Sequence, residues 1–214
     1  MQLILYYAPI TCALVPYVTL TEAGAPFEVR PLNFGKAQHM APEYLALTAK
    51  HKVPVLVIDG EKLTENVAIQ QWIARNFPAA RLLPSAPMQE LKAISLMAWC
   101  ASGIHPFLFR IHAPQRCCDL PGAAESVRRL AQEQLFEAYR IADDLLADRE
   151  FFFDHFTAAD AHFFWCFRRG TQFNLDVSQF QHCMAHFERM KRRPSVQKVL
   201  AFEADVQADF AKAA

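Results

Sequence analysis

Cys12 is the first residue whose type and position suggest chemistry. It follows Thr11 at the point where an apolar, strand-like run gives way to a helical pattern. A helix N-terminus presents unpaired N–H groups and the positive end of the macrodipole, and both lower the pKa of a thiol. We therefore expect this position to stabilise a thiolate, either that of Cys12 or that of a ligand. Each residue keeps two interpretations. Thr11 either caps the helix or donates a hydrogen bond from its hydroxyl to a sulfur. Cys12 either reacts or packs as a small apolar side chain.

Val53 and Pro54 form a second candidate feature, directly before a short apolar run at residues 55–58. An X-Pro bond is the only peptide bond that adopts the cis form at modest cost. A cis bond here would turn the backbone N–H and C=O of Val53 outward, as an edge on which an extended peptide pairs. The alternative is a trans proline that simply opens a strand.

Glu65 and Asn66 open the next helical pattern, so a carboxylate, an amide and unpaired N–H groups share one turn. Such a turn can hold a zwitterion, because the N–H groups bind a carboxylate and Glu65 binds an ammonium. An ordinary capped helix is the alternative.

The remaining candidates are weaker. His105 lies in the middle of a long helical pattern, where a packed or solvated histidine is the simpler interpretation. Cys117 and Cys118 follow a histidine, but adjacent cysteines do not easily share one ion and no second cluster stands nearby, so we discount a metal.

The elements that position these residues fall into two halves. Up to residue 78, short strand-like runs alternate with helical segments, which predicts a βαβ unit followed by a hairpin and a helix. A proline-spaced stretch at residues 79–88 is the predicted linker. Residues 89–214 show repeated three-to-four spacing of apolar side chains, which predicts an all-α bundle. Its helices are expected at residues 90–109, 123–146, 158–169, 179–191 and 195–210.

Composition limits the function. The chain has 214 residues, 53% of them hydrophobic, and a formal net charge of zero, which predicts a folded globule with no electrostatic reason to bind nucleic acid. We find no stretch near the roughly 20 apolar residues that cross a membrane, and no targeting segment. Six scattered cysteines without a C-x-x-C pair indicate reduced thiols. We therefore expect a cytoplasmic protein with no membrane partner.

Taken together, these motifs resemble one family. The order of Tyr6-x-x-x-x-Thr11-Cys12, then Lys52-Val53-Pro54-Val55-Leu56, then Leu63-Thr64-Glu65-Asn66-Val67-Ala68-Ile69 is similar to the glutathione-binding half of the cytosolic glutathione transferases. Phe156-Thr157-Ala158-Ala159-Asp160 resembles the capping box of their helical domain. Cys12 and His105 resemble the pair that marks the bacterial beta class.

The resemblance implies a thioredoxin-like α/β domain over residues 1–78, an all-α domain over 89–214 and a homodimer. It implies a cis bond before Pro54, with the backbone of Val53 paired to the cysteinyl part of glutathione. Glu65 and Asn66 would hold the γ-glutamyl end, although a serine is commoner where Asn66 stands. Lys36 and Lys52 would bind the glycyl carboxylate of glutathione. His105 would reach the site from the helical domain.

Three residues depart from the pattern: Ala13 replaces a serine, Ala98 an asparagine, and Gly103 an acidic residue. Three hypotheses follow. The leading one is a glutathione transferase that activates the glutathione thiol for attack on a hydrophobic electrophile. The second is a glutathione-dependent thiol–disulfide oxidoreductase or peroxidase that uses Cys12, and the third is a non-catalytic binding protein of the same fold.

For the leading hypothesis, the expected donors to the glutathione sulfur are Thr11, the Cys12 N–H and His105. Tyr7 is the alternative donor, because strand alternation lets only one of Tyr6 and Tyr7 face the site and Tyr7 has the better spacing to Pro9. The second substrate, and the choice among conjugation, isomerase, dehalogenase and reductase chemistry, are not determined by the sequence.

Overall fold

The first apolar run of the chain becomes a central strand of a small mixed sheet. The computed structural model describes residues 1–212. Its sheet has the order β2-β1-β3-β4, in which β1 pairs in parallel with β2 and antiparallel with β3, and β3 pairs antiparallel with β4. The strands are β1 (Leu3–Tyr7), β2 (Glu28–Pro31), β3 (Val55–Ile58) and β4 (Glu61–Thr64).

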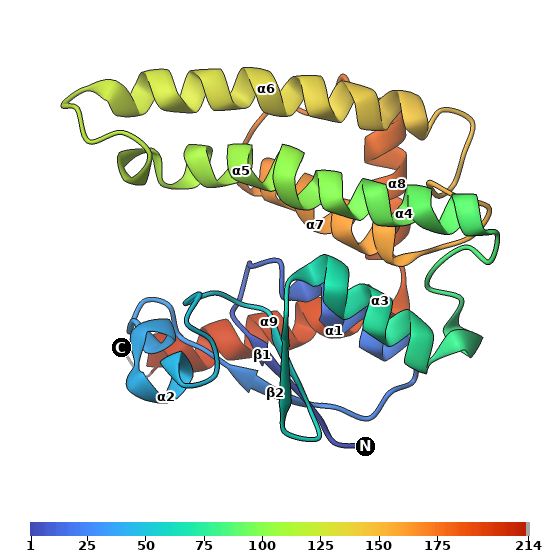
Figure 1. Cartoon of the computed structure of the whole chain (residues 1–214). Coiled ribbons are helices and arrows are strands. Elements are labelled where there is room, and N and C mark those ends of the chain that lie inside the picture. Colours follow the sequence, from blue (N-terminus) through green and yellow to red (C-terminus); the bar gives the residue numbers. More distant parts are fainter. Residues whose placement is uncertain (213–214) are drawn as a thin grey trace. The chain divides into compact units, whose positions relative to one another are not determined.

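Helices from both ends of the chain pack with this sheet (Figure 1). α1 (Leu14–Glu22) connects β1 to β2, as parallel pairing requires. α1 packs against α3 (Asn66–Asn76) and against α9 (Pro194–Lys212), the last helix of the chain. The shorter elements are η1 (Gln38–Met40), α2 (Pro42–Leu45) and η2 (Pro78–Ala80). The core holds the fully buried side chains of Leu5, Leu14, Leu20, Leu56, Ile69 and Ile73.

The predicted thioredoxin-like fold is confirmed, but the division of the chain differs from the expected one. The first compact unit contains Met1–Ser85 together with the chain from Lys191 onward, and the second is Ala86–Met190. The sequence placed all of residues 89–214 in one helical domain. α9 instead joins the first unit, because its apolar face packs on α1. The expected linker at 79–88 also ends early, since Pro87 is the first residue of α4.

The second unit is helical, as predicted. Its helices are α4 (Pro87–Trp99), α5 (His105–His112), α6 (Ala123–Leu145), α7 (Ala158–Gln172) and α8 (Gln181–Lys191), with short turns η3 (Cys100–Ile104) and η4 (Pro114–Arg116). α6 packs along α5, and α7 packs against both α4 and α5. Three phenylalanines of α7, Phe163, Phe164 and Phe167, are fully buried and lie in the core of this unit.

The π-helical turn η3 gives a physical reason for one of the departures from the family pattern. Gly103 lies in this turn, and a Cβ atom there would overlap the indole ring of Trp99. An acidic side chain, which the resemblance expects at this position, does not fit under the ring. π-turns inside helices are frequent at functional sites.

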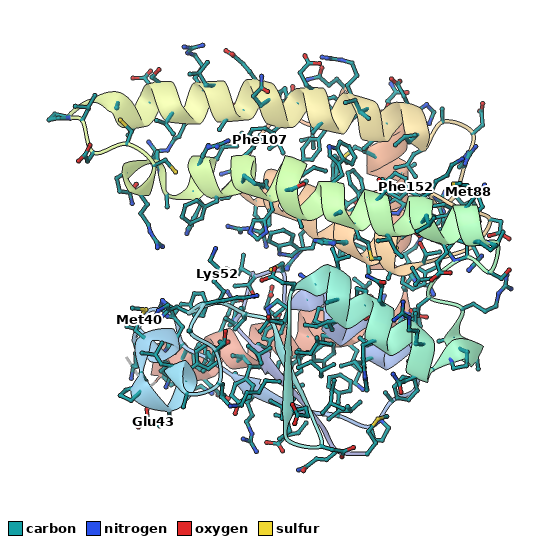
Figure 2. All side chains as sticks on the ribbon, viewed as in Figure 1. Met40, Glu43, Lys52, Met88, Phe107 and Phe152 are labelled. Carbon is teal, nitrogen blue, oxygen red and sulfur yellow. The ribbon has the colours of Figure 1, made fainter. Side chains whose placement is uncertain are left out.

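The continuous helical stretch Pro87–His112 is longer and more apolar than the sequence analysis expected. Its most apolar window has a mean hydropathy of 1.2 and is 22% buried, so by length and composition alone it is able to cross a membrane. A single such helix is weak evidence for a span, because helices of soluble proteins pass the same test. Met88, labelled in Figure 2, lies on it and is exposed.

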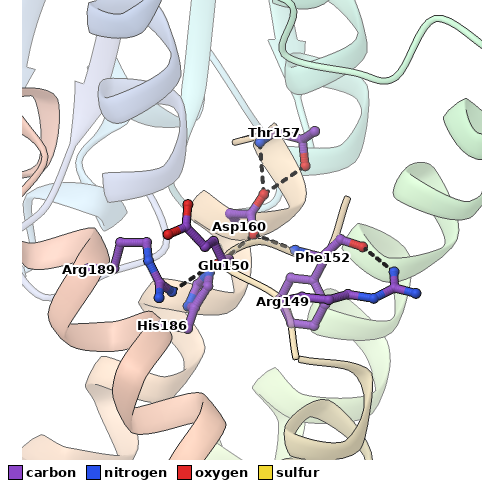
Figure 3. A network of polar contacts seen from close by, with 7 residues as sticks. All are labelled: Arg149, Glu150, Phe152, Thr157, Asp160, His186 and Arg189. Atoms are coloured by element: carbon purple, nitrogen blue, oxygen red, sulfur yellow. Dashed lines mark hydrogen bonds and ion pairs between the residues drawn. The ribbon is translucent and has the colours of Figure 1, made fainter. Parts of the chain in front are cut away.

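The predicted capping box at the start of α7 is confirmed (Figure 3). Asp160 Oδ2 accepts hydrogen bonds from the backbone N–H of Thr157 at 2.8 Å and from its hydroxyl at 3.0 Å. Asp160 Oδ1 accepts a further bond from the N–H of Phe152 and lies 3.1 Å from Nε2 of His186. The carboxylate is fully buried and satisfied on both oxygens, so it fixes the start of the central helix.

Candidate functional site

The turn between β1 and α1, residues 8–13, is the centre of the candidate site, and we call it the thiol turn. The hydroxyl of Thr11 donates to the carbonyl of Ala8 at 2.7 Å and accepts from the N–H of Ala13 at 3.3 Å. α1 begins only at Leu14, with Ala13 as its N-cap and no side-chain cap. Thr11 therefore neither caps the helix nor points its proton at a sulfur in this structure; it closes the turn.

Cys12 is buried, with 9% of its surface exposed. Its Sγ lies 3.6 Å from the carbonyl oxygen of Val53, to which it donates. Burial raises the pKa of the Cys12 thiol from its ordinary value of 9.0 to about 12, and hydrogen bonds from its own N–H and from Asn66 oppose this shift only in part. Of the two alternatives for Cys12, the structure agrees with the buried, packed thiol, because desolvation outweighs these hydrogen bonds.

Tyr7 is the last residue of β1, directly before the thiol turn, and its side chain faces the interior. Its side chain is fully buried, and its hydroxyl donates to Oε2 of Glu203 on α9 at 2.7 Å. The same carboxylate oxygen accepts the backbone N–H of Ile10 at 2.7 Å. The hydroxyl proton of Tyr7 is therefore directed at Glu203, which argues against Tyr7 as the donor to a ligand sulfur.

The segment before β3 lies directly beside the thiol turn. The Val53–Pro54 bond is cis, as the resemblance implies. The carbonyl of Val53 accepts the Cys12 thiol, while its N–H donates no hydrogen bond within residues 1–212. One backbone donor of Val53 is therefore available to a peptide ligand.

The start of α3 carries the other predicted contacts. Glu65 has a positive φ of 69° and an exposed side chain, which forms an ion pair of 2.6 Å with Nζ of Lys50. Lys50 Nζ also donates to the hydroxyl of Thr64 at 2.9 Å. The carboxylate thus faces solvent at a helix N-terminus, beside a cation that the sequence analysis did not consider.

Asn66 connects this helix to the thiol turn. Its side chain is buried, and Nδ2 donates to the carbonyl of Cys12 at 3.1 Å. Its Oδ1 is also buried and has no hydrogen-bond partner within the described residues. The structure therefore brings Cys12, Val53 and Asn66 together, and leaves an acceptor on Asn66 for a further donor.

The two predicted lysines are exposed. Lys52, labelled in Figure 2, lies next to Val53, and its carbonyl accepts the hydroxyl of Tyr44 at 2.7 Å. Lys36 lies in the loop after β2, where its N–H donates to Asn33 Oδ1 at 3.1 Å. Neither side chain is buried, so both are able to move toward an anionic ligand.

His105 belongs to the second unit, where it is the first residue of α5. Its ring lies 4.5 Å from that of Trp165, centroid to centroid. The neighbouring His162 on α7 is fully buried, and burial, together with the charge of His105, lowers its pKa to about 3. His162 is therefore neutral at physiological pH.

Sequence reasoning missed Glu203 and Lys50. A signal for Glu203 exists, because it lies on the same face of the last helix as the buried Val199 and Val206, and a carboxylate on a core face needs partners. Lys50 carries no comparable signal. Within residues 1–212, no group of three or more His, Cys, Asp and Glu side chains is arranged to hold a metal ion.

Comparisons with known proteins agree with this geometry. The family model for the glutathione S-transferase N-terminal domain matches residues 1–75. The glutathione S-transferase GstA of Escherichia coli O157:H7 is 30% identical over 203 residues, which cover 93% of this chain and 98% of that protein.

Two solved structures are similar over nearly the whole chain. A sphingomonad glutathione S-transferase complexed with glutathione has 25% identity and a TM-score of 0.83, with 94% of this chain and 98% of that one covered. The bacterial beta class enzyme of Sphingomonas chungbukensis has 27% identity and a TM-score of 0.83, with the same coverage.

Proposed function

Because this chain belongs to the glutathione S-transferase family, we propose that it binds glutathione at the thiol turn and activates its sulfur for attack on a hydrophobic electrophile. One observation carries the proposal: the buried contacts of Cys12 with Val53 and Asn66 join the segments expected to hold the cysteinyl and γ-glutamyl parts of the tripeptide.

The proposed binding mode uses the residues that the sequence analysis assigned to glutathione. The N–H of Val53 pairs with the cysteinyl carbonyl of glutathione. The exposed carboxylate of Glu65 binds the γ-glutamyl ammonium, and the buried Oδ1 of Asn66 accepts a hydrogen bond from the same group. Lys36 and Lys52 neutralise the negative charge of the glycyl carboxylate of glutathione.

Activation of glutathione requires that its thiol ionises near neutral pH. Lowering a thiol pKa from about 8.5 to about 6.5 needs about 2.7 kcal/mol of preference for the anion. One hydrogen bond to a charged group supplies about 1.5 to 3 kcal/mol, and a helix terminus about 0.3 to 1 kcal/mol. The Cys12 N–H, which has no acceptor within residues 1–212 other than its own sulfur, is the donor we favour.

The chemical step is a displacement. The glutathione thiolate forms a C–S bond to an electrophilic carbon, the bond to the leaving group breaks, and the electron pair departs with, for example, chloride. Cys12 takes no covalent part, because a thiol with a pKa near 12 supplies almost no thiolate at pH 7. This argues against the oxidoreductase hypothesis. Conjugation of this kind would serve detoxification, and His105 is the candidate donor from the helical unit.

The test combines binding and titration. The ultraviolet absorbance of bound glutathione, followed against pH, should report a thiol pKa clearly below that of free glutathione, and a chloronitrobenzene should be conjugated. Cys12→Ala should retain the lowered pKa. The proposal fails if glutathione binds but stays a thiol up to the pH at which it ionises in water.

We also propose that the chain forms a homodimer through the exposed face of Pro87–His112. Met88 and Leu91 are apolar and exposed there, at 64% and 58% of their surface. Light scattering should give a dimer mass that Leu91→Glu lowers toward a monomer, while Leu130→Glu, an exposed apolar position on α6, does not. Sedimentation with lipid vesicles would contradict this proposal and the expected cytoplasmic location, because the helix would then be in contact with a membrane.

A further inference from the structure

Glu203 is a buried carboxylate on the last helix that contacts both the end of β1 and the thiol turn. Only 2% of its surface is exposed. Its Oε2 accepts the hydroxyl of Tyr7 and the N–H of Ile10, each at 2.7 Å. Both are short hydrogen bonds to an acid in the interior, where such a group needs strong donors.

The contact with Ile10 is unusual because of the backbone conformation at that residue. Ile10 has a φ of 69°, in the left-handed region that a β-branched side chain strongly disfavours. Such conformations persist only where the surrounding structure enforces them, and they cluster at functional sites. The hydrogen bond from the Ile10 N–H to Glu203 is a contact that holds this residue in place.

The conformation of Ile10 determines the path of the residues that follow. After Ile10, Thr11 folds back so that its N–H and its hydroxyl both donate to the carbonyl of Ala8. That closure brings the Cys12 N–H to the end of the turn, with no acceptor in the described chain apart from its own sulfur. A different φ at Ile10 would rotate the peptide planes of Thr11 and Cys12.

We propose that Glu203 is a positioning residue for glutathione activation: by holding Ile10 and Tyr7, it aims the Cys12 N–H at the sulfur of bound glutathione. This inference rests on the proposed function. In this proposal Glu203 does not touch the substrate and acts through Tyr7 and Ile10. The last helix of the chain therefore sets the geometry of a turn near the first.

The decisive experiment measures the apparent pKa of the bound glutathione thiol by ultraviolet titration, together with kcat, KM for glutathione and Tm. Glu203→Ala should raise that pKa by about one unit and lower kcat about tenfold below the pKa, because one unit is a tenfold change in ionisation. KM for glutathione should change less than about threefold, since the contacts that bind the tripeptide are untouched.

Two further variants make the result specific. Glu22→Gln removes a charge that binds Arg193, directly before α9, and Ser195 in the first turn of α9, so it should lower Tm without moving the thiol pKa. Ile10→Gly in the Glu203→Ala background should recover more than half of the pKa shift, because glycine adopts a positive φ without steric cost.

Folded Glu203→Ala with a wild-type thiol pKa would overturn the inference, as would an equal pKa shift in Glu22→Gln. If Glu203→Ala does not fold, Glu203→Gln decides: its neutral oxygen accepts the same bonds more weakly, so a smaller rise in the thiol pKa is expected, and none at all contradicts us. A wild-type protein that binds glutathione without ionising it would instead overturn the proposed function.

Discussion

Two turns in the first unit each contain a residue with a positive φ, and different kinds of contact surround these two residues. Ile10 precedes α1 and Glu65 precedes α3, and each has a φ of 69°. Ile10 is held by the buried carboxylate of Glu203, 193 residues away in the chain. Glu65 is exposed, and its partner Lys50 is only 15 residues away and also exposed.

The difference indicates that the thiol turn is rigid, whereas Glu65 is able to exchange its partner. Hydrogen bonds to a buried charge are strong and costly to break, whereas exposed ion pairs contribute about 0.2 to 1 kcal/mol and weaken with salt. We therefore expect the thiol turn to hold its geometry when glutathione binds. Glu65 should exchange Lys50 for the ligand ammonium at little cost.

The largest expected effect that sharpens this comparison is on Glu65. Glu65→Ala should raise the Kd for glutathione by about 10- to 100-fold, because a hydrogen bond to a charged group worth about 1.5 to 3 kcal/mol is lost. Tm should stay near that of the wild type, since the side chain is exposed. Calorimetric titration and a thermal melt measure both quantities. Glu61→Ala, an exposed acid on the same hairpin, is the control and should leave the Kd unchanged.

Asn66 joins the two turns, so its loss should affect both. Asn66→Ala removes the buried bond to the carbonyl of Cys12, which keeps its second partner, the N–H of Val15. We expect about 0.5 to 1.5 kcal/mol less stability in urea unfolding. Glutathione should also bind more weakly. An unchanged unfolding midpoint would mean that the two turns are held independently.

Cys12→Ala should change the conjugation rate less than about threefold at pH 7, because the thiol of Cys12 is not ionised there.

The Cys12 thiol should affect the free energy of unfolding at high pH. The folded pKa of about 12 exceeds the ordinary value of 9.0, so the native state keeps its proton longer and wild-type stability falls as the pH rises between these values. The slope is at most about 1.4 kcal/mol per pH unit. Urea unfolding at pH 8 and pH 10.5 measures it, and the slope should be smaller in Cys12→Ala.

The smallest expected effect is that of Lys50. Lys50→Ala removes an exposed ion pair and should cost less than about 1 kcal/mol of stability, a difference that 1 M salt should largely abolish. A loss comparable to that of Asn66→Ala, and insensitive to salt, would contradict the proposed contrast between the two turns.

Much of the fold was predictable because it depends on local signals. The apolar run at residues 55–58 and the hairpin expected in this half correspond to β3 and β4, and the capping box marked the start of α7. The π-turn at residues 100–104, where the Trp99 ring lies close to Gly103, was not predictable, because the apolar spacing of this segment indicates one continuous helix.

Only part of the candidate site was predictable from such local signals. The residue types at Cys12, Val53 and Asn66 marked the positions that the fold brings together. The sequence left open whether Cys12 reacts or packs, because a helix N-terminus is visible in a sequence whereas the burial that raises the pKa of this thiol is not.

What the sequence determined by itself is the order of strands and helices and the identity of the polar residues at their ends, since periodicity and capping act over a few neighbours. Only the tertiary structure decided that α9 packs on α1 and that Glu203 contacts Tyr7 and Ile10. Contacts across almost the whole chain depend on how the helices and strands pack, and packing follows from shape and burial that no local pattern records.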